Sequence, residues 1–242
     1  MSEQSEHLVK SFDQDLKKLT DTLVRMGGIV ESQVALAADA VMNRNAEAAT
    51  RAVEEDTRVD ALEREIEQSV VRMLALRQPM AADLRLAVAS LKASGDLERI
   101  GDYAANVAKR SIVLEQFSMP PTLTGLAHMS GLVQENLKAI IDALGESDAD
   151  KAMEVWRSDA AIDDIYNALF RELVTYMMED PRNITPCTHL LFIAKNLERI
   201  GDHATNIAET IHYIVHGEPP GLARPKGDTT AYTTIPSGKS GA

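Results

Sequence analysis

The hexapeptide Leu-Glu-Arg-Ile-Gly-Asp occurs twice in the chain, at residues 97–102 and again at residues 197–202. After each hexapeptide the same small and polar residues follow at alternate positions, as Ala104, Asn106 and Ala108 and then as Ala204, Asn206 and Ala208. Upstream, the match continues from Met26, Gly28, Asp39, Asp56 and Asp60 to Met129, Gly131, Asp142, Asp159 and Asp163. A register shared over this length indicates an internal duplication.

Each copy has the pattern of three consecutive helices. Within residues 47–77, apolar side chains recur three and four positions apart, which is the spacing of an amphipathic helix: Val59, Leu62, Ile66, Val70 and Met73. We expect helices near 8–44, 47–77, 81–117, 122–145, 148–179 and 186–215. No segment shows the alternation of a strand. The sequence therefore predicts an all-α protein of two tandem, pseudo-symmetric three-helix bundles, over residues 8–118 and 122–216.

Proline and glycine mark the expected ends of these helices. Pro120 and Pro121 separate the two copies. Thr185 before Pro186 predicts an N-cap with proline at the first helical position. Residues 217–242 lack periodicity and are rich in Pro, Gly, Ser and Thr, so we expect a disordered C-terminal tail.

The amino-acid composition argues against several classes of protein. Apolar residues make up 45% of the 242 positions and aromatic residues only 4%, which favours helix packing over sheets. The formal charge of −12 argues against a nucleic-acid partner, because phosphate contacts need clustered Lys and Arg. The single cysteine, Cys187, excludes an internal disulfide and agrees with a cytoplasmic protein. No run approaches about 18 apolar residues, so direct membrane insertion is not expected.

Four acidic pairs carry the candidate chemistry, because residues four positions apart share one face of a helix. The pairs are Asp56 with Asp60, Glu98 with Asp102, Asp159 with Asp163, and Glu198 with Asp202. In an antiparallel hairpin, residues equally far from the turn lie level with each other. Asp60 and Glu98 are equally far from Pro79, and the other acids are placed in the same way about their own turns. We therefore expect one four-carboxylate patch in each copy.

The helix expected near 81–117 presents its acids on what looks like a packed face. At about 100° per residue, one stripe is formed by Leu84, Val88, Leu91 and Gly95 and is continued by Glu98 and Asp102. The interpretation is that carboxylates replace apolar residues along a buried stripe.

Like charges this close repel each other and need compensation. Protonation is one solution, and basic neighbours are another, with Arg99, Arg199 and Lys195 as candidates. The third is bound cations, since oxygen-only ligands suit hard and intermediate metals. The patches therefore predict a site for divalent or trivalent ions (Fe, Mn, Mg or Zn), including multinuclear clusters, with purely structural ion pairs as the competing interpretation.

A helical chain with these acids could also be a purely structural scaffold that binds no metal. A carboxylate-bridged metal-binding or storage bundle is the alternative function, because such bundles also present inward carboxylates. The oxygen-activating members combine Glu with Glu-x-x-His motifs, and none of the eight acids begins such a motif. No G-x-S-x-G elbow, P-loop or G-x-G-x-x-G sequence occurs, so the chain is not expected to be an enzyme.

The doubled LERIGD-x-A-x-N-x-A block resembles the PhoU family of phosphate transport system accessory proteins, over roughly residues 8–216. The resemblance implies two three-helix PhoU repeats related by a pseudo-twofold axis, with multinuclear metal clusters on the E/D-x-x-x-D motifs. Those motifs fall on the eight acids named above. The copies depart from each other where Asn196 stands for Asp96 and where His203 stands for Tyr103. His203, directly after Asp202, is a candidate member of the second patch.

The same resemblance implies negative regulation of the phosphate-starvation response and of phosphate uptake. Its implied partners are the ATPase subunit of a phosphate ABC transporter and a phosphate sensor histidine kinase. It also implies a homodimer in the cytoplasm that associates peripherally with membrane complexes. None of these expectations follows from composition or periodicity.

Overall fold

The computed structural model describes residues 3–118, 123–221 and 227–230. In this part of the chain there are six α-helices and no strand, which confirms the all-α prediction. The helices are α1 (Glu3–Met42), α2 (Ala46–Arg77), α3 (Ala81–Leu114), α4 (Leu123–Glu146), α5 (Ala149–Glu179) and α6 (Ile184–His216). A 3-10 turn, η1 (Pro181–Asn183), leads directly into α6.

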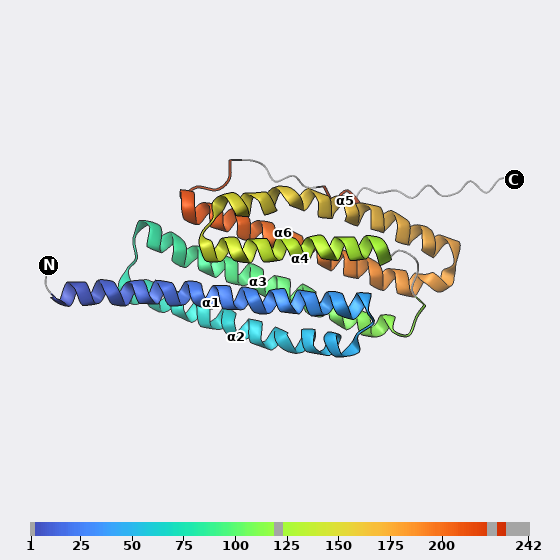
Figure 1. Cartoon of the computed structure of the whole chain (residues 1–242), viewed down its shortest axis with the longest axis horizontal. Helices are drawn as coiled ribbons and strands as arrows, with labels where there is room; N and C mark the ends of the chain where they lie inside the picture. The colour runs from blue at the N-terminus through green and yellow to red at the C-terminus, as the bar shows by residue number, and fades with distance from the viewer. Residues whose placement is uncertain (1–2, 119–122, 222–226, 231–242) are drawn as a thin grey trace.

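The two sequence copies form two three-helix layers that lie side by side (Figure 1). Helices α1–α3 pack on one another, as do α4–α6, and the layers meet through α3 against α6 and α1 against α4. One hydrophobic core runs through both layers, with Leu97 and Ile100 of α3 and Leu197 and Ile200 of α6 all buried within it. The duplicated hexapeptide thus lies on the two helices that join the halves.

The glycine of each hexapeptide lets a polar side chain approach the helix backbone next to the acids. A Cβ atom added to Gly101 would lie 2.9 Å from Gln33 Oε1 of α1. The equivalent atom on Gly201 would lie 2.8 Å from Asp159 Oδ1 of α5. Carbon atoms do not come this close to neighbours without displacing them, so glycine at these positions makes room for the polar groups beside α3 and α6.

Side-chain caps start the second helix of each layer. Asn45 Oδ1 accepts a hydrogen bond from Ala48 N, and Asp148 Oδ1 accepts from Lys151 N. The expected cap at Thr185 is wrong, because α6 begins at Ile184. The 3-10 turn before α6 already winds the chain, so Thr185 falls inside the first helical turn. Pro186 is tolerated there because the first-turn N–H groups lack intrahelical partners.

The periodicity of α2 predicts its core face, whereas the stripe expected on α3 does not. All five apolar residues of the α2 stripe are buried. On α3, however, Leu84 is 40% exposed, and Val88 and Leu91 are only partly buried. The packed faces of α3 instead carry small residues such as Ala93 and Ala104, because this helix contacts α1, α2 and α6 at once. A helix with three neighbours buries more than one stripe.

Part of the C-terminal tail is packed against the helices. Gly217 ends α6 with a left-handed φ of 81°, as expected for a glycine C-cap. The expectation of disorder from there onward does not hold for residues 227–230, which hydrogen-bond to α5 and α6. Pro120, Pro121 and the remaining tail residues lie outside the described part of the chain.

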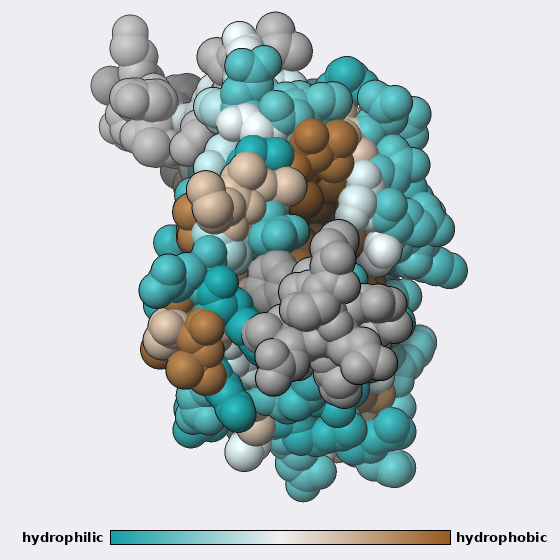
Figure 2. All heavy atoms as spheres, turned by 90° about the vertical axis from the view of Figure 1, so that its left-hand side faces the viewer, coloured by the Kyte–Doolittle hydropathy of each residue, from teal (hydrophilic) through white to brown (hydrophobic). Residues whose placement is uncertain are grey.

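Exposed apolar side chains occur near both hairpin tips. Leu76 and Met80 flank the α2–α3 turn and are 68% and 80% exposed, and Met178 near the α5–α6 turn is 62% exposed. Figure 2 looks onto the end that holds the α2–α3 turn and shows hydrophobic patches between hydrophilic surface. None of the described helices combines the length and the apolar character needed to cross a membrane.

Replacing Ser147 with glycine is expected to stabilise the fold. Ser147 follows α4 with a left-handed φ of 55°, a conformation that costs a non-glycine residue about 1 kcal/mol. We expect Ser147→Gly to raise the free energy of unfolding by roughly 0.5–1 kcal/mol in urea denaturation. Ser147→Ala is the matched control, since alanine keeps the strain. Equal stability of the two variants would contradict the assignment.

Candidate functional site

The acids of the first copy lie within electrostatic reach of one another across the α2–α3 hairpin. The negative charge of Asp102 on α3 helps to raise the pKa of Asp56 on α2. Asp60 on α2 contributes in the same way to the raised pKa of Glu98 on α3. These are the two level pairs that equal distance from the turn predicts. We call Asp56, Asp60, Glu98 and Asp102 the first patch.

Glu98 is the most perturbed member of the first patch. Burial is the largest cause and the Asp102 charge the next, and together they raise its pKa to about 7. The guanidinium of Arg99 opposes this rise, since its nitrogens lie 3.6 Å from Glu98 Oε2 and 3.4 Å from Asp102 Oδ2. Of the three basic neighbours proposed from sequence, Arg99 therefore serves the first patch.

Two residues that the sequence reasoning missed adjoin the first patch. Glu63 stands one turn beyond Asp60, and its pKa is raised by burial and then by the charges of Glu67 and Asp60. Gln33 of α1 reaches across and donates from Nε2 to Asp56 Oδ1 at 3.3 Å and to the Ala52 carbonyl at 3.0 Å. Its own Oε1 is buried without a hydrogen-bond partner. The spacing of three positions from Asp60 could have identified Glu63 in the sequence. Nothing in the sequence singles out Gln33.

The acids of the second copy are more deeply buried; we call Asp159, Asp163, Glu198 and Asp202 the second patch. The Glu198 side chain is 4% exposed, whereas the equivalent Glu98 is 22% exposed. Asp159 and Asp163 are also buried, at 3% and 5%. The first patch is thus open to solvent on one side, and the second is nearly closed.

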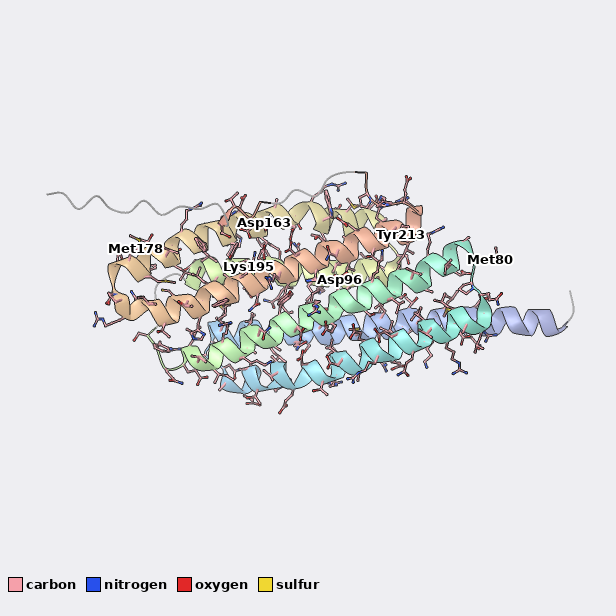
Figure 3. The ribbon with its side chains drawn as sticks, turned by 180° about the vertical axis from the view of Figure 1, so that it is seen from behind. Met80, Asp96, Asp163, Met178, Lys195 and Tyr213 are labelled. Carbon is pink, nitrogen blue, oxygen red and sulfur yellow. The ribbon has the colours of Figure 1, made fainter. Side chains whose placement is uncertain are left out.

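A partly buried lysine compensates part of the second patch. Lys195 Nζ donates to Glu198 Oε1 at 2.8 Å, and this contact works against the rise in the Glu198 pKa. Burial nevertheless dominates, and with the Asp202 charge it raises that pKa to about 7. The other oxygen, Glu198 Oε2, is buried without a hydrogen-bond partner. Figure 3 shows Asp163 and Lys195 on the neighbouring helices α5 and α6.

The chain's own tail lies against the second patch. Gly227 N donates to Asp163 Oδ2 at 2.7 Å, and Asp228 Oδ2 accepts from Lys195 Nζ at 2.7 Å. The lysine therefore bridges Glu198 to a tail carboxylate. Among the described residues, no segment covers the first patch in the way that residues 227 and 228 cover the second.

The copies differ from each other at Asp96 and at His203, and these two side chains contact each other at the interface between the layers. His203 of α6 does not join the second patch, because its Nδ1 lies 2.7 Å from Asp96 Oδ1 of α3. Asn206 Nδ2 donates to the same oxygen at 3.1 Å, and the Tyr103 ring lies 5.6 Å from the His203 ring. Figure 3 places Asp96 between α3 and α6. Arg199 stacks 5.5 Å over Tyr103, so this third basic candidate belongs to the interface as well.

The side-chain conformations in this structure bear on whether the acids can bind a metal ion. Among the described residues, no three His, Cys, Asp or Glu side chains are arranged to hold a metal ion. The chain does contain one Glu-x-x-His sequence, from Glu209 to His212 in α6. Glu209 accepts a hydrogen bond from Trp156 Nε1 at 3.0 Å, and His212 Nδ1 lies 3.0 Å from the Glu218 carbonyl oxygen. This pair is therefore engaged elsewhere than at the patches.

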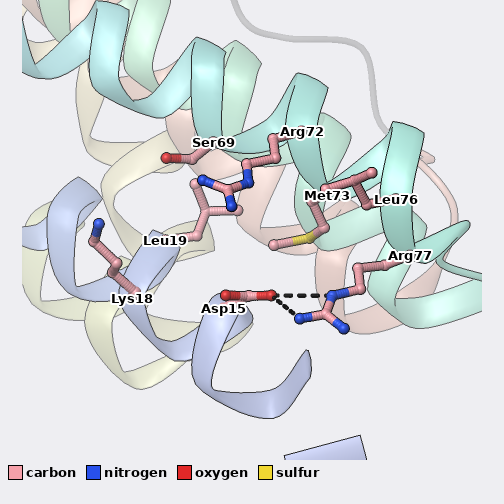
Figure 4. A pocket seen from close by; sticks show the side chains of 8 residues that line it. All are labelled: Asp15, Lys18, Leu19, Ser69, Arg72, Met73, Leu76 and Arg77. Carbon is pink, nitrogen blue, oxygen red and sulfur yellow. Dashed lines mark hydrogen bonds and ion pairs between the residues drawn. The ribbon is translucent and has the colours of Figure 1, made fainter. Parts of the chain in front are cut away.

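A separate pocket of about 330 Å³ lies between α1 and α2, away from the acids (Figure 4). Arg77 and Asp15 close one side through an ion pair, with Arg77 nitrogens 3.0 and 3.2 Å from Asp15 Oδ2. The pocket is lined by Asp15, Lys18, Leu19, Ser69, Arg72, Met73, Leu76 and Arg77. Its mixed charges single out no ligand.

Comparison with known proteins gives a consistent match. The family model described as the PhoU domain matches residues 23–111 and again 126–211. A phosphate-specific transport system accessory protein PhoU homolog from Caulobacter vibrioides (strain NA1000 / CB15N) is 52% identical over 225 residues, covering 93% of this chain and 98% of the relative. The homolog from Rhizobium meliloti (strain 1021) is 47% identical over 226 residues, covering 93% of this chain and 95% of the relative.

Two solved structures share the fold. The crystal structure of PhoU from Pseudomonas aeruginosa matches with a TM-score of 0.84 at 42% identity, covering 86% of this chain and 100% of that one. The phosphate transport system regulatory protein PhoU from Streptococcus pneumoniae matches with a TM-score of 0.81 at 30% identity, covering 87% of this chain and 100% of that one.

The raised pKa values of the two glutamates predict how stability varies with pH. A carboxyl group whose pKa is raised from 4.5 to about 7 on folding binds its proton more tightly in the folded state. In metal-free buffer, the free energy of unfolding is therefore expected to fall as pH rises from 5 to 8. Each glutamate contributes on the order of 3 kcal/mol at most. Urea denaturation across this range measures the slope.

Neutral variants isolate the two groups. Glu98→Gln and Glu198→Gln are each expected to flatten the slope, because the amide does not titrate. Glu172→Gln, at an exposed position on α5, is the control and leaves the slope unchanged. Slopes that are the same in all four proteins would contradict the raised pKa values.

Proposed function

This chain belongs to the PhoU family of phosphate transport accessory proteins, and we propose that it keeps the phosphate-starvation response and phosphate uptake off while phosphate is plentiful. In this role it is an adaptor between the ATPase subunit of a phosphate ABC transporter and a phosphate sensor histidine kinase. The observation that carries the proposal is near full-length identity, 52% over 93% of the chain, to an accessory protein of phosphate-specific transport. That relative is named as an accessory protein of transport, and the link to a kinase is our own proposal.

The shape of the molecule supports an adaptor that meets two partners. Met80 and Met178 mark opposite ends of the structure (Figure 3). Both are more than half exposed, and further exposed apolar residues lie near each of them along the helices. Exposed apolar side chains near charged surface are typical of protein contacts. An elongated bundle with apolar residues at both ends suits simultaneous contact with a transporter and a kinase.

We further propose that the carboxylate patches hold metal ions, starting with the first patch. Its donors would be Asp56, Asp60, Glu98 and Asp102. They supply only oxygen, which suits Mg, Mn, Fe or Zn. Burial and, after it, the charge of Asp102 raise the pKa of Glu98, and a positive charge at this place would offset both. A bound ion would supply that charge and draw the side chains together. The remaining exposure of Asp60 and Asp102 leaves a path for the ion.

Neutralising the first patch is expected to remove at least one bound metal ion per chain. The test variant carries Asp56→Asn, Asp60→Asn, Glu98→Gln and Asp102→Asn. Equilibrium dialysis against manganese, followed by elemental analysis, measures the ions bound. The control variant neutralises four exposed helix acids, with Glu47→Gln, Glu54→Gln, Asp150→Asn and Glu172→Gln. Equal manganese binding by both variants would refute the metal proposal and leave the regulatory one standing.

Deleting the gene is expected to release the phosphate-starvation response in phosphate-rich medium. Alkaline phosphatase activity should rise in the deletion strain and return to the repressed level when the full chain is restored. The rise should vanish when the sensor kinase gene is also deleted, because repression then has no kinase to act through. A deletion strain that stays repressed contradicts the regulatory role, and a rise that persists without the kinase contradicts the kinase arm.

A further inference from the structure

Residues Gly227–Thr230 lie along α5 and α6 beside the second patch, held by hydrogen bonds and an ion pair. We propose that this surface is a binding site for a Gly-Asp-Thr-Thr segment, and that the chain's own tail is its ligand. The site is formed by Asp163, Tyr166, Asn167, Lys195 and Glu198. Asp163 and Asn167 bind the backbone of the segment, Lys195 binds the Asp228 carboxylate, and Tyr166 shares a side-chain hydrogen bond with Thr230.

The side-chain amide of Asn167 recognises the peptide backbone. Its Nδ2 donates to the Gly227 carbonyl at 2.7 Å, and its Oδ1 accepts from Thr229 N at 3.1 Å. One amide thus pairs with the carbonyl of one residue and the N–H of the second residue after it, as a neighbouring strand would. Asn167 is only 8% exposed, so its amide needs such partners. This contact fixes the backbone of residues 227–229 against α5.

The close approach of the segment to α5 explains why residue 227 is a glycine. Gly227 N donates to Asp163 Oδ2 at 2.7 Å, which brings the backbone against α5. A Cβ atom added to Gly227 would lie 2.9 Å from Asp163 Cβ, an atom that cannot move without the helix. Any larger residue at this position therefore loosens the contact.

The positive charge of Lys195 explains why residue 228 is an aspartate. Asp228 Oδ2 accepts from Lys195 Nζ at 2.7 Å, while the same ammonium donates to the buried Glu198 at 2.8 Å. Charge-assisted hydrogen bonds between partly buried groups are stronger than exposed ion pairs. The other oxygen of Asp228 accepts from Thr230 N and Thr230 Oγ1, at 2.9 and 2.6 Å, and so fixes the turn of the segment.

The first copy lacks the groups that make this site. At the positions equivalent to Tyr166 and Asn167, the first copy has Glu63 and Arg64. Lys195 is replaced by Gly95. An acidic segment would meet Glu63 instead of a tyrosine and would find no lysine or amide clamp. The segment therefore selects the second patch, and its presence contributes to the closure of that patch while the first stays open.

Trypsin cleavage tests the proposal in the full-length chain, independently of metals and of the regulatory role. The bond between Lys226 and Gly227 is cut only when the residues after it leave α5 and α6 and enter the protease. We expect the native chain to be cut there at least tenfold more slowly than a synthetic peptide of residues 222–233. Mass spectrometry follows this bond and, as an internal reference, the bond after Lys239.

Substitutions decide whether the named contacts give the protection. Asp228→Asn and Gly227→Ala are each expected to remove most of it, with each rate divided by that of a peptide carrying the same change. Asn167→Leu should act likewise from the helix side, and the tail variants decide the matter if that variant is unstable. Glu218→Gln, in the exposed start of the tail, is the control and keeps full protection. A native chain cut as fast as the peptide, or tail variants as protected as the native chain, would overturn the proposal.

Discussion

Burial of carboxylates that lie close to other carboxylates is the constraint on which the rest of this structure depends. Burial is the larger cost, because it removes the water that would solvate the charges. A helical hairpin also aligns residues equally far from its turn, so Asp60 adds its charge to Glu98, and Asp102 adds its charge to Asp56. A folded chain must therefore supply protons, basic side chains or bound cations at these positions.

The two copies meet this constraint differently. The first patch relies on Arg99 at its surface and remains open, whereas the second contains Lys195 and is covered by residues 227–230. Of the two equivalent acid clusters, one is thus accessible and the other is enclosed. The two copies also differ at the layer interface, where Asp96 of the first copy pairs with His203 of the second.

Local patterns in the sequence predicted those features that depend on neighbours within one hairpin. The repeat established the architecture, the α2 spacing identified its buried face, and equal distance from the turn paired the acids of the first copy. Features that depend on distant contacts were missed. The three-sided packing of α3 hid its buried faces, and the 3-10 turn displaced the start expected at Thr185. A tail without periodicity concealed the segment 227–230, which binds to α5 and α6. Pseudo-symmetry could have signalled the pairing of Asp96 with His203.

The ionisation of the two hexapeptide glutamates measures the central constraint directly. Carbon-13 NMR of the side-chain carboxyl groups, assigned through Glu98→Gln and Glu198→Gln, follows each proton in the metal-free chain. Both groups are predicted to titrate near pH 7, some two and a half units above an ordinary glutamate. If both instead titrate near 4.5, the carboxyl groups are neither desolvated nor crowded, and neither cations nor the tail would be needed to stabilise them.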